Sequence, residues 1–242
     1  AGQRTHFEHE YRMKHADGSI RWVLCRGIAV RDEAGQALRL AGSQTDITEQ
    51  RLIRDSLAQA ARHDALTDLP NRTLFRELLQ RAIAQNTRAP FKTYAVLFID
   101  LDGFKLVNDT HGHVVGDRFL KAIGARLQSQ LRSGEALARL GGDEFAVLTQ
   151  HFDDPRDVRV IAERLLRALV EPLPVSGLQL RGGASIGIVI GDPNQRSVDA
   201  VLRDADIAMY RAKAAGRGGY ELFDPAMHAS DLKRLTFETE LR

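Results

Sequence analysis

Two short acidic segments have the residue types and the spacing to do chemistry. In Phe98-Ile99-Asp100-Leu101-Asp102 an apolar run ends in two acids, and in Gly141-Gly142-Asp143-Glu144 two glycines precede two acids. Carboxylates that converge on one point repel each other and normally need a cation between them. Oxygen ligands without clustered His or Cys favour Mg2+ or Mn2+ over zinc. Such acid pairs occur in polymerase-type palms, where metals activate a 3′-hydroxyl and stabilise a pyrophosphate leaving group.

The two segments meet only if a strand and a hairpin lie side by side in one sheet. Residues 94–100 are predicted to form a buried strand, and residues 136–140 and 145–149 form two strands joined by the glycine turn. Glycines in that turn would let a nucleotide approach the backbone. Taken alone, Gly-Gly-Asp is also an ordinary turn sequence. Two acids after a fully apolar strand are harder to explain by structure alone.

The order of elements from residue 94 onward predicts an α+β fold. It contains β-α-β-β-α-β, the ferredoxin-like arrangement, in which helices cover one face of the sheet. The other helices of this order are predicted over 115–131 and 157–170, with a strand at 184–190. Elsewhere we expect strands at 7–14, 20–30, 38–44, 177–181 and 220–223, and helices at 49–63, 70–86, 198–215 and in the tail 225–242.

The composition excludes some classes of partner. Lys and Arg number 34 and Asp and Glu 32, so a net charge of +2 gives no general attraction to nucleic acid or to anionic membranes. No apolar run approaches the roughly 18 residues of a membrane span. A single cysteine, Cys25, permits no intrachain disulfide and fits a reducing compartment. We therefore expect a cytoplasmic chain without nucleic-acid or membrane contacts, although membrane segments could lie outside this sequence.

The same segments resemble the GGDEF family of diguanylate cyclases, which join two GTP molecules into cyclic di-GMP. Residues 141–145 match the family signature letter for letter. Further motifs similar to those of the family lie in order along the chain, at 64–72, 100–105, 108–117 and 205–213. The resemblance covers roughly residues 62 to 224, and this many ordered motifs make it specific. The expected organisation is a C-terminal part of a PAS domain at 1–48, a signalling helix at 49–63, a GGDEF domain at 64–224 and a helical tail or linker at 225–242.

The resemblance implies a metal site and a set of catalytic residues. In the family, the residues that match Asp100 and Asp143 bind magnesium (or manganese) through their carboxylates, and the residue that matches Leu101 binds it through its backbone carbonyl. Asp143 is implied as the proton acceptor for the 3′-hydroxyl, with Glu144 beside it. Lys105 is implied to stabilise charge on the phosphates in the transition state.

The resemblance also implies how GTP is held. Asn108 and Asp117 would read the guanine edge, and His113 belongs to the same substrate site. Lys213 and Arg217 match phosphate binders and, four residues apart, are expected on one helix face. Without the motifs, Lys213 and Arg217 would be interpreted as a solvated helix face, and Asn108 as part of a turn or cap.

One segment departs from the family pattern. Active members often carry an inhibitory product site, Arg-x-x-Asp, shortly before the signature, and here that position is Arg132-Ser133-Gly134-Glu135. The glutamate is one methylene longer than aspartate, which misplaces a contact that depends on geometry. We predict weakened inhibition by cyclic di-GMP, with Arg139 as a further contributor to this degenerate site.

Both flanks resemble parts of other domains. Residues 11–22 are similar to a strand pair of PAS domains, and residues 46–51 are similar to the segment by which the chain leaves that fold. Trp22 and Cys25 are interpreted there as core residues. Residues 223–227 resemble the junction that precedes an EAL phosphodiesterase domain.

Catalysis by this family implies a homodimer, because one domain binds one GTP and the product contains two. The PAS segment and the helix at 49–63 would control how often the two halves meet. The main alternative is a catalytically silent GGDEF domain that binds GTP or cyclic di-GMP and regulates an attached EAL domain. The intact acids and Lys105 favour the enzyme. A third hypothesis, a protein-interaction module, leaves the acids unexplained.

Overall fold

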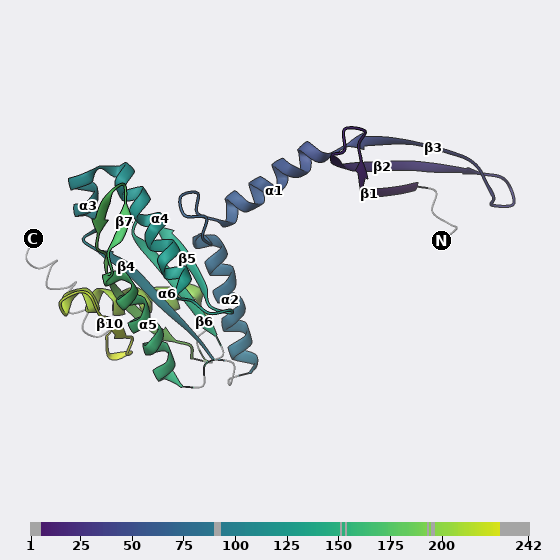
Figure 1. The fold of residues 1–242 in the computed structure, drawn as a ribbon. Helices are drawn as coiled ribbons and strands as arrows, with labels where there is room; N and C mark the ends of the chain where they lie inside the picture. Colours follow the sequence, from purple (N-terminus) through teal and green to yellow (C-terminus); the bar gives the residue numbers. More distant parts are fainter. Residues whose placement is uncertain are drawn as a thin grey trace, which may run out of the picture. The chain divides into compact units, whose positions relative to one another are not determined.

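The computed structural model describes residues 6–89, 93–150, 152, 154–192, 194 and 197–227. The chain divides into two compact units, Ala1–Ala61 and Arg62–Arg242 (Figure 1). Most of the expected tail helix, residues 228–242, lies outside the described residues.

The first unit is an antiparallel sheet followed by a helix. Its strands are β1 (His6–Lys14), β2 (Ile20–Arg31) and β3 (Ala37–Asp46), in the order β1-β2-β3, and helix α1 covers Thr48–Arg62. The meander predicted from the alternating pattern is thus confirmed. Trp22 and Cys25 are only partly buried, so the prediction that they are core residues was wrong. Within the described chain the open sheet lacks a second layer that could cover them.

Trp22 instead connects the sheet to α1. The Ile47 amide donates to the Trp22 carbonyl at 2.8 Å, and the Trp22 amide donates to Thr48 Oγ1 at 2.8 Å. The Arg51 guanidinium lies 3.9 Å from the centre of the Trp22 ring, a cation–π contact, and also pairs with Glu10. The start of α1 is therefore fixed to the sheet at several points.

The second unit is built on a five-stranded sheet in the order β10-β9-β4-β6-β5. The central strand β4 is antiparallel to both β6 and β9, and β10 is parallel to β9. The elements are α2 (Arg72–Arg88), β4 (Tyr94–Asp102), α3 (Phe104–His111), α4 (His113–Ser129), β5 (Ala136–Gly141), β6 (Glu144–Gln150), α5 (Pro155–Val170), the hairpin β7 (Leu173–Val175) with β8 (Leu178–Leu180), β9 (Gly183–Ile190), α6 (Val198–Ala214) and β10 (Tyr220–Leu222).

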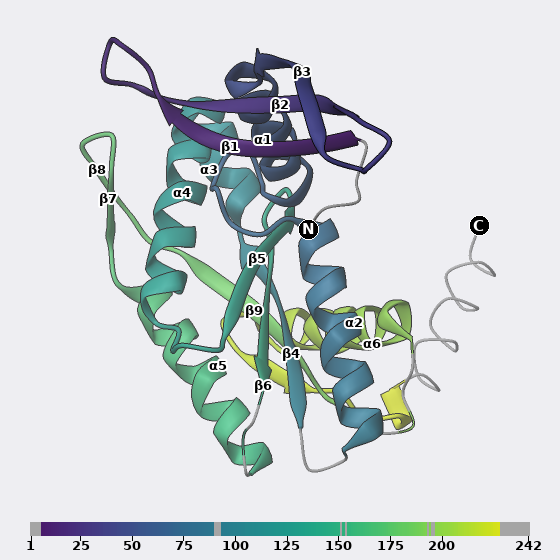
Figure 2. The same ribbon diagram turned by 90° about the vertical axis from the view of Figure 1, so that its right-hand side faces the viewer.

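Helices cover both faces of this sheet, and Figure 2 shows α4 and α5 on one side and α2 and α6 on the other. Successive side chains of a strand point to opposite faces. Leu97 and Ile99 accordingly pack with α4 and α5, whereas Val96 and Phe98 pack with α2 and α6. The β-α-β-β-α-β core is as predicted, but the expectation of helices on one face was wrong because α2 and α6, outside that core, bury the second face.

Helix α3 and strand β7 were not predicted. Helix α3 is only eight residues long and lies between Gly103 and Gly112, whose φ angles are 75° and 82°. Such left-handed glycines are typical of turns, and Asn108 and Asp109 are also common in turns. The local sequence therefore favours a turn, and the short helix could not be predicted from it.

Candidate active site

The end of β4 and the tip of the β5–β6 hairpin are neighbours, as the sequence predicted. Asp100 on β4 lies directly opposite Glu144 on β6, and the Leu101 amide donates to the Asp143 carbonyl at 3.3 Å. Gly142 and Asp143 form the loop, and Gly142 takes a left-handed φ of 51° that an L side chain rarely adopts. The hairpin therefore places its acids against the end of the central strand.

The side chains of Asp100 and Glu144 lie on the sheet face covered by α2 and α6. Burial raises the pKa of Asp100, and the neighbouring Asp143 and Asp102 add to that rise. The Lys213 ammonium opposes it, with Nζ 2.7 Å from Asp100 Oδ1. Asp100 therefore lies near two further carboxylates and one lysine, a setting in which an added cation would be stabilised.

A second group of acids adjoins the first. Burial raises the pKa of Glu144, and Asp206, Asp100 and Asp143 raise it further, while Arg72 lowers it through an ion pair of 3.2 Å. Burial also raises the pKa of Asp206, on α6, and Lys213 lowers it. Arg72 and Asp206 were not predicted as site residues from the sequence, although they lie inside the family motifs at 64–72 and 205–213.

The residues fit a divalent cation that is only partly held by protein. Among the residues that the structure describes, no three His, Cys, Asp or Glu side chains gather as a complete metal cage. Two carboxylates and a backbone carbonyl are a sparse donor set, and Mg2+ typically accepts one or two carboxylates, keeps waters and takes phosphate oxygens. The half-buried acids with raised pKa values supply the negative charge that such an ion would neutralise.

The predicted guanine residues lie on the α3–α4 pair. Asn108 is on α3, His113 is the first residue of α4, and the exposed Asp117 is on its next turn. Gly116 lets the two helices approach, because a Cβ there would lie 1.8 Å from Asn108 Oδ1. The Asn108 side chain is therefore held against the backbone next to Asp117. Lys105 is exposed at the start of α3.

Lys213 and Arg217 are near the acids but not on one helix face. Helix α6 ends at Ala214, and Arg217 follows in a turn with Gly216 and Gly218. The expectation of one face was wrong because these glycines, with φ angles of 128° and 66°, terminate the helix. The two cations still reach neighbouring acids of β4: Lys213 pairs with Asp100, and Arg217 Nε lies 4.0 Å from Asp102 Oδ1.

Comparison with known protein families decides the assignment. The family model for the diguanylate cyclase GGDEF domain matches residues 61–219, and the model for the PAS fold matches residues 1–44. The chain belongs to the GGDEF family. Its second unit is a GGDEF domain, and its first unit carries a PAS fragment.

Individual relatives agree with the family model. The chain is 35% identical over 240 residues to the uncharacterized protein y4lL of Sinorhizobium fredii, covering 96% of this chain and 29% of that protein. It is 41% identical over 186 residues to MucR of Pseudomonas aeruginosa, named a bifunctional diguanylate cyclase and cyclic di-GMP phosphodiesterase, covering 77% of this chain and 27% of that protein. The solved GGDEF domain of TpbB from Pseudomonas aeruginosa superimposes with a TM-score of 0.66 at 39% identity, over 69% of this chain and 97% of that one. The chain thus spans less than a third of the two curated relatives.

Arg139 holds the GGDEF hairpin to the start of the domain. Its guanidinium donates to both carboxylate oxygens of Asp64, at 2.9 and 3.1 Å, and to the Gly142 carbonyl, at 3.0 and 2.7 Å. Asp64 also accepts from the amide and hydroxyl of Thr67. Arg139 was expected to contribute to the product site, and its guanidinium lies in this cluster with Asp64 and Gly142.

Arg132 and Glu135 line a separate hollow of about 390 Å3 beside α5. The Glu135 carboxylate accepts from the Arg132 amide at 2.8 Å and from Arg164 at 3.1 Å, and its side chain is 10% exposed. Arg139 is not among the residues that line this hollow. The acid of the degenerate motif is therefore already paired within the domain.

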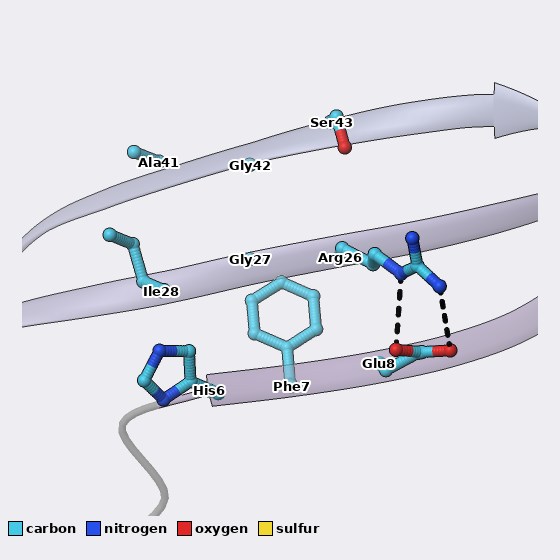
Figure 3. A pocket seen from close by; sticks show the side chains of 9 residues that line it. All are labelled: His6, Phe7, Glu8, Arg26, Gly27, Ile28, Ala41, Gly42 and Ser43. Carbon is cyan, nitrogen blue, oxygen red and sulfur yellow. Dashed lines mark hydrogen bonds and ion pairs between the residues drawn. The ribbon is translucent and has the colours of Figure 1, made fainter.

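The PAS fragment carries another hollow, of about 520 Å3, on the open face of its sheet. In Figure 3 the Phe7 ring lies against Gly27, and the only ion pair drawn joins Glu8 to Arg26. A Cβ at Gly27 would come within 2.3 Å of the Phe7 ring. All the residues that line this hollow belong to the PAS fragment, so the hollow is not part of the candidate active site.

No described helix is both long and apolar enough to pass through a bilayer.

Proposed function

We propose that the GGDEF domain of this chain is an active diguanylate cyclase that condenses two GTP molecules into cyclic di-GMP and two pyrophosphates. The observation that carries the proposal is the juxtaposition of Asp100 at the end of β4 with the Asp143-Glu144 hairpin tip, where burial raises the pKa of two carboxylates. A purely structural turn gains nothing from such crowding, because like charges at neighbouring positions destabilise the fold.

Each residue then has a distinct task. Asp143 accepts the proton of the 3′-hydroxyl as that oxygen bonds to the α-phosphorus of the second GTP and the bond to pyrophosphate breaks. Lys213, which pairs with Asp100 at 2.7 Å, and Arg217 bind the phosphates, and Lys105 stabilises their charge. Asn108 and Asp117 select guanine, with His113 in the same site.

Asp100, Asp143 and the Leu101 carbonyl would hold Mg2+ or Mn2+, and the pairing of the Lys213 ammonium with Asp100 is consistent with a cation at this position. When bound, the ion would lower the pKa of the attacking hydroxyl and neutralise charge on the phosphates.

We further propose that the reaction takes place in a homodimer under the control of the PAS fragment. One domain offers one site, so two must face each other to close the ring. Helix α1 exposes Leu52, Ile53 and Leu57, an apolar strip suited to a second copy. Its first turn is fixed to the PAS sheet through Trp22, so a change in that sheet would alter the pairing of the helices. Positioning of two reactants is worth up to about 7–11 kcal/mol of barrier, enough for a switch.

The test is to incubate the purified chain with GTP and MgCl2 and to separate the nucleotides by chromatography. Wild type should form cyclic di-GMP and pyrophosphate, and Asp143→Ala should form neither. Asp199→Asn is the matched control, an exposed acid at the first turn of α6 that pairs with Arg76. Wild-type protein that binds GTP and forms no product would overturn the cyclase and support the silent regulatory module.

A further inference from the structure

Asp102 is the acid at the end of β4 that the proposed metal set leaves without a role. It lies two residues after Asp100, on the same face of the strand, and its side chain is 11% exposed. Oδ1 accepts from the Ser185 hydroxyl at 2.9 Å, and Oδ2 accepts from the Gly218 amide at 3.0 Å. Ser185 on β9 is fully buried. Asp102 thus joins the sheet to the turn that follows α6.

That turn has an unusual backbone. Gly216, Arg217 and Gly218 have φ angles of 128°, 62° and 66°, so three successive residues lie in the left-handed region, and the middle one is an arginine. A non-glycine residue keeps such a conformation only where its surroundings hold it. The Arg217 amide donates to the Ala212 carbonyl at 3.2 Å, which ties the turn to its own helix.

Two bonds tie the same turn to the sheet. One is the bond from the Gly218 amide to Asp102, and the other is the bond from the Ile186 amide to the Gly219 carbonyl at 2.9 Å. Of these two bonds, only the one from Gly218 involves a side chain, that of Asp102, and Gly218 directly follows Arg217. Because Asp102 is itself fixed by Ser185, the position of the Arg217 backbone follows from the position of β4.

The same carboxylate also faces the charge of Arg217. Arg217 Nε lies 4.0 Å from Asp102 Oδ1, yet the arginine side chain is 68% exposed, so its outer nitrogens remain open to a ligand. Lys213 and Arg217 are thereby arranged over two acids of one strand face, Asp100 and Asp102. An anionic group with several phosphate oxygens could meet both cations at once.

We propose that Asp102 is a positioning residue for the phosphates of GTP: it does not touch the nucleotide, but through the Gly218 amide it fixes the turn that presents Arg217. This inference rests on the proposed function and deepens it. It predicts that the loss of Asp102 weakens GTP binding only as far as Arg217 contributes to that binding.

The test is a double-mutant cycle between Asp102→Ala and Arg217→Ala, with initial rates of pyrophosphate release measured across GTP concentrations. Asp102→Ala should raise KM about tenfold and leave kcat within about threefold. In the Arg217→Ala background it should change KM by no more than about twofold. An equal rise in KM in both backgrounds would overturn the positioning role, because a residue that merely supports the fold acts regardless of Arg217.

Asp102→Asn guards against loss of folding. Its amide oxygen can accept from Gly218 and its NH2 group can donate to Ser185 Oγ, so both tethers are kept and KM should stay within about threefold of wild type. A KM raised as far as in Asp102→Ala, in protein with the far-ultraviolet circular dichroism of wild type, contradicts the tether. If wild type binds GTP without turnover, the cyclase proposal fails, and the same cycle is measured as Kd by calorimetry. If it binds no GTP, both proposals fail.

Discussion

Replacement of Arg139 by alanine should loosen the GGDEF hairpin from the start of its domain. The variant loses two bonds to Asp64 and two to the Gly142 carbonyl. The side chains of Arg139 and Asp64 are 10% and 20% exposed. Removal of one partner from a buried ion pair costs about 3–5 kcal/mol. Because the Asp64 carboxylate stays partly exposed to solvent and keeps two hydrogen bonds from Thr67, we expect the free energy of unfolding to fall by about 3 kcal/mol, at the lower end of that range.

The assay is urea unfolding followed by far-ultraviolet circular dichroism, which reports chiefly on the helices of the GGDEF domain. The single tryptophan, Trp22, lies in the other unit and would not report on this change. Wild type, Arg139→Ala, Asp64→Asn and the double variant form a cycle with an expected coupling of at least about 1.5 kcal/mol. Arg118→Ala, which removes one exposed bond to Ser176, is the control and should cost less than about 0.5 kcal/mol. A loss below about 1 kcal/mol in Arg139→Ala, or simple additivity, would refute the reasoning.

The pH dependence of this cluster follows from Asp64. Burial raises the pKa of Asp64, but hydrogen bonds from Thr67 and Arg139 outweigh burial and leave that pKa below its ordinary value. A lowered folded-state pKa stabilises the protein above the ordinary pKa, and this contribution disappears as the pH falls through the lowered pKa. The stability advantage of wild type over Asp64→Asn should therefore be complete at pH 7 and shrink below about pH 4. An advantage that grows on acidification would contradict the assignment.

Three further predictions concern specificity, inhibition and control. Gly116→Ala should raise KM for GTP about tenfold, because the new Cβ displaces the Asn108 side chain. Gly124→Ala on the same helix is the control and should change KM much less, since its Cβ would lie 3.1 Å from the nearest side-chain atom. Equal effects of the two substitutions on KM would count against the placement of Asn108. Added cyclic di-GMP should slow the initial rate of product formation only weakly, since the Glu135 carboxylate already pairs with Arg164, and a rate that falls steeply as cyclic di-GMP is added would be the opposite result. Insertion of four residues after Gln59 should change the cyclase rate, because it rotates the end of α1 relative to its start, and an unaltered rate argues against control through this helix.

The sequence revealed those parts of the site that depend on local pattern. The apolar strand before Asp100 and the glycine turn before Asp143 have clear periodicity, and their antiparallel pairing follows from the short connection within the hairpin and the order of elements. Contacts between distant segments left no such trace. Asp64 and Arg139 are 75 residues apart, and Asp102 and Gly218 are 116 apart, so neither bond is visible in spacing along the chain.

The left-handed Arg217 shows a second limit of sequence reasoning. Spacing alone placed Lys213 and Arg217 on one helix, yet Gly216 and Gly218 end the helix before the arginine. Glycine lowers helix propensity but does not by itself fix where a helix stops, since neighbouring contacts decide. Here the Asp102 carboxylate makes one of those contacts.

The central claim is that a divalent cation binds between the end of β4 and the hairpin tip. Electron paramagnetic resonance of Mn2+, titrated into the chain with a GTP analogue whose α- and β-phosphates are bridged by methylene, tests it most directly. Wild type and the Asp199→Asn control should bind Mn2+ equally, and Asp100→Asn and Asp143→Asn should each weaken binding by at least about tenfold. Equal Mn2+ affinity in all four proteins would contradict the account.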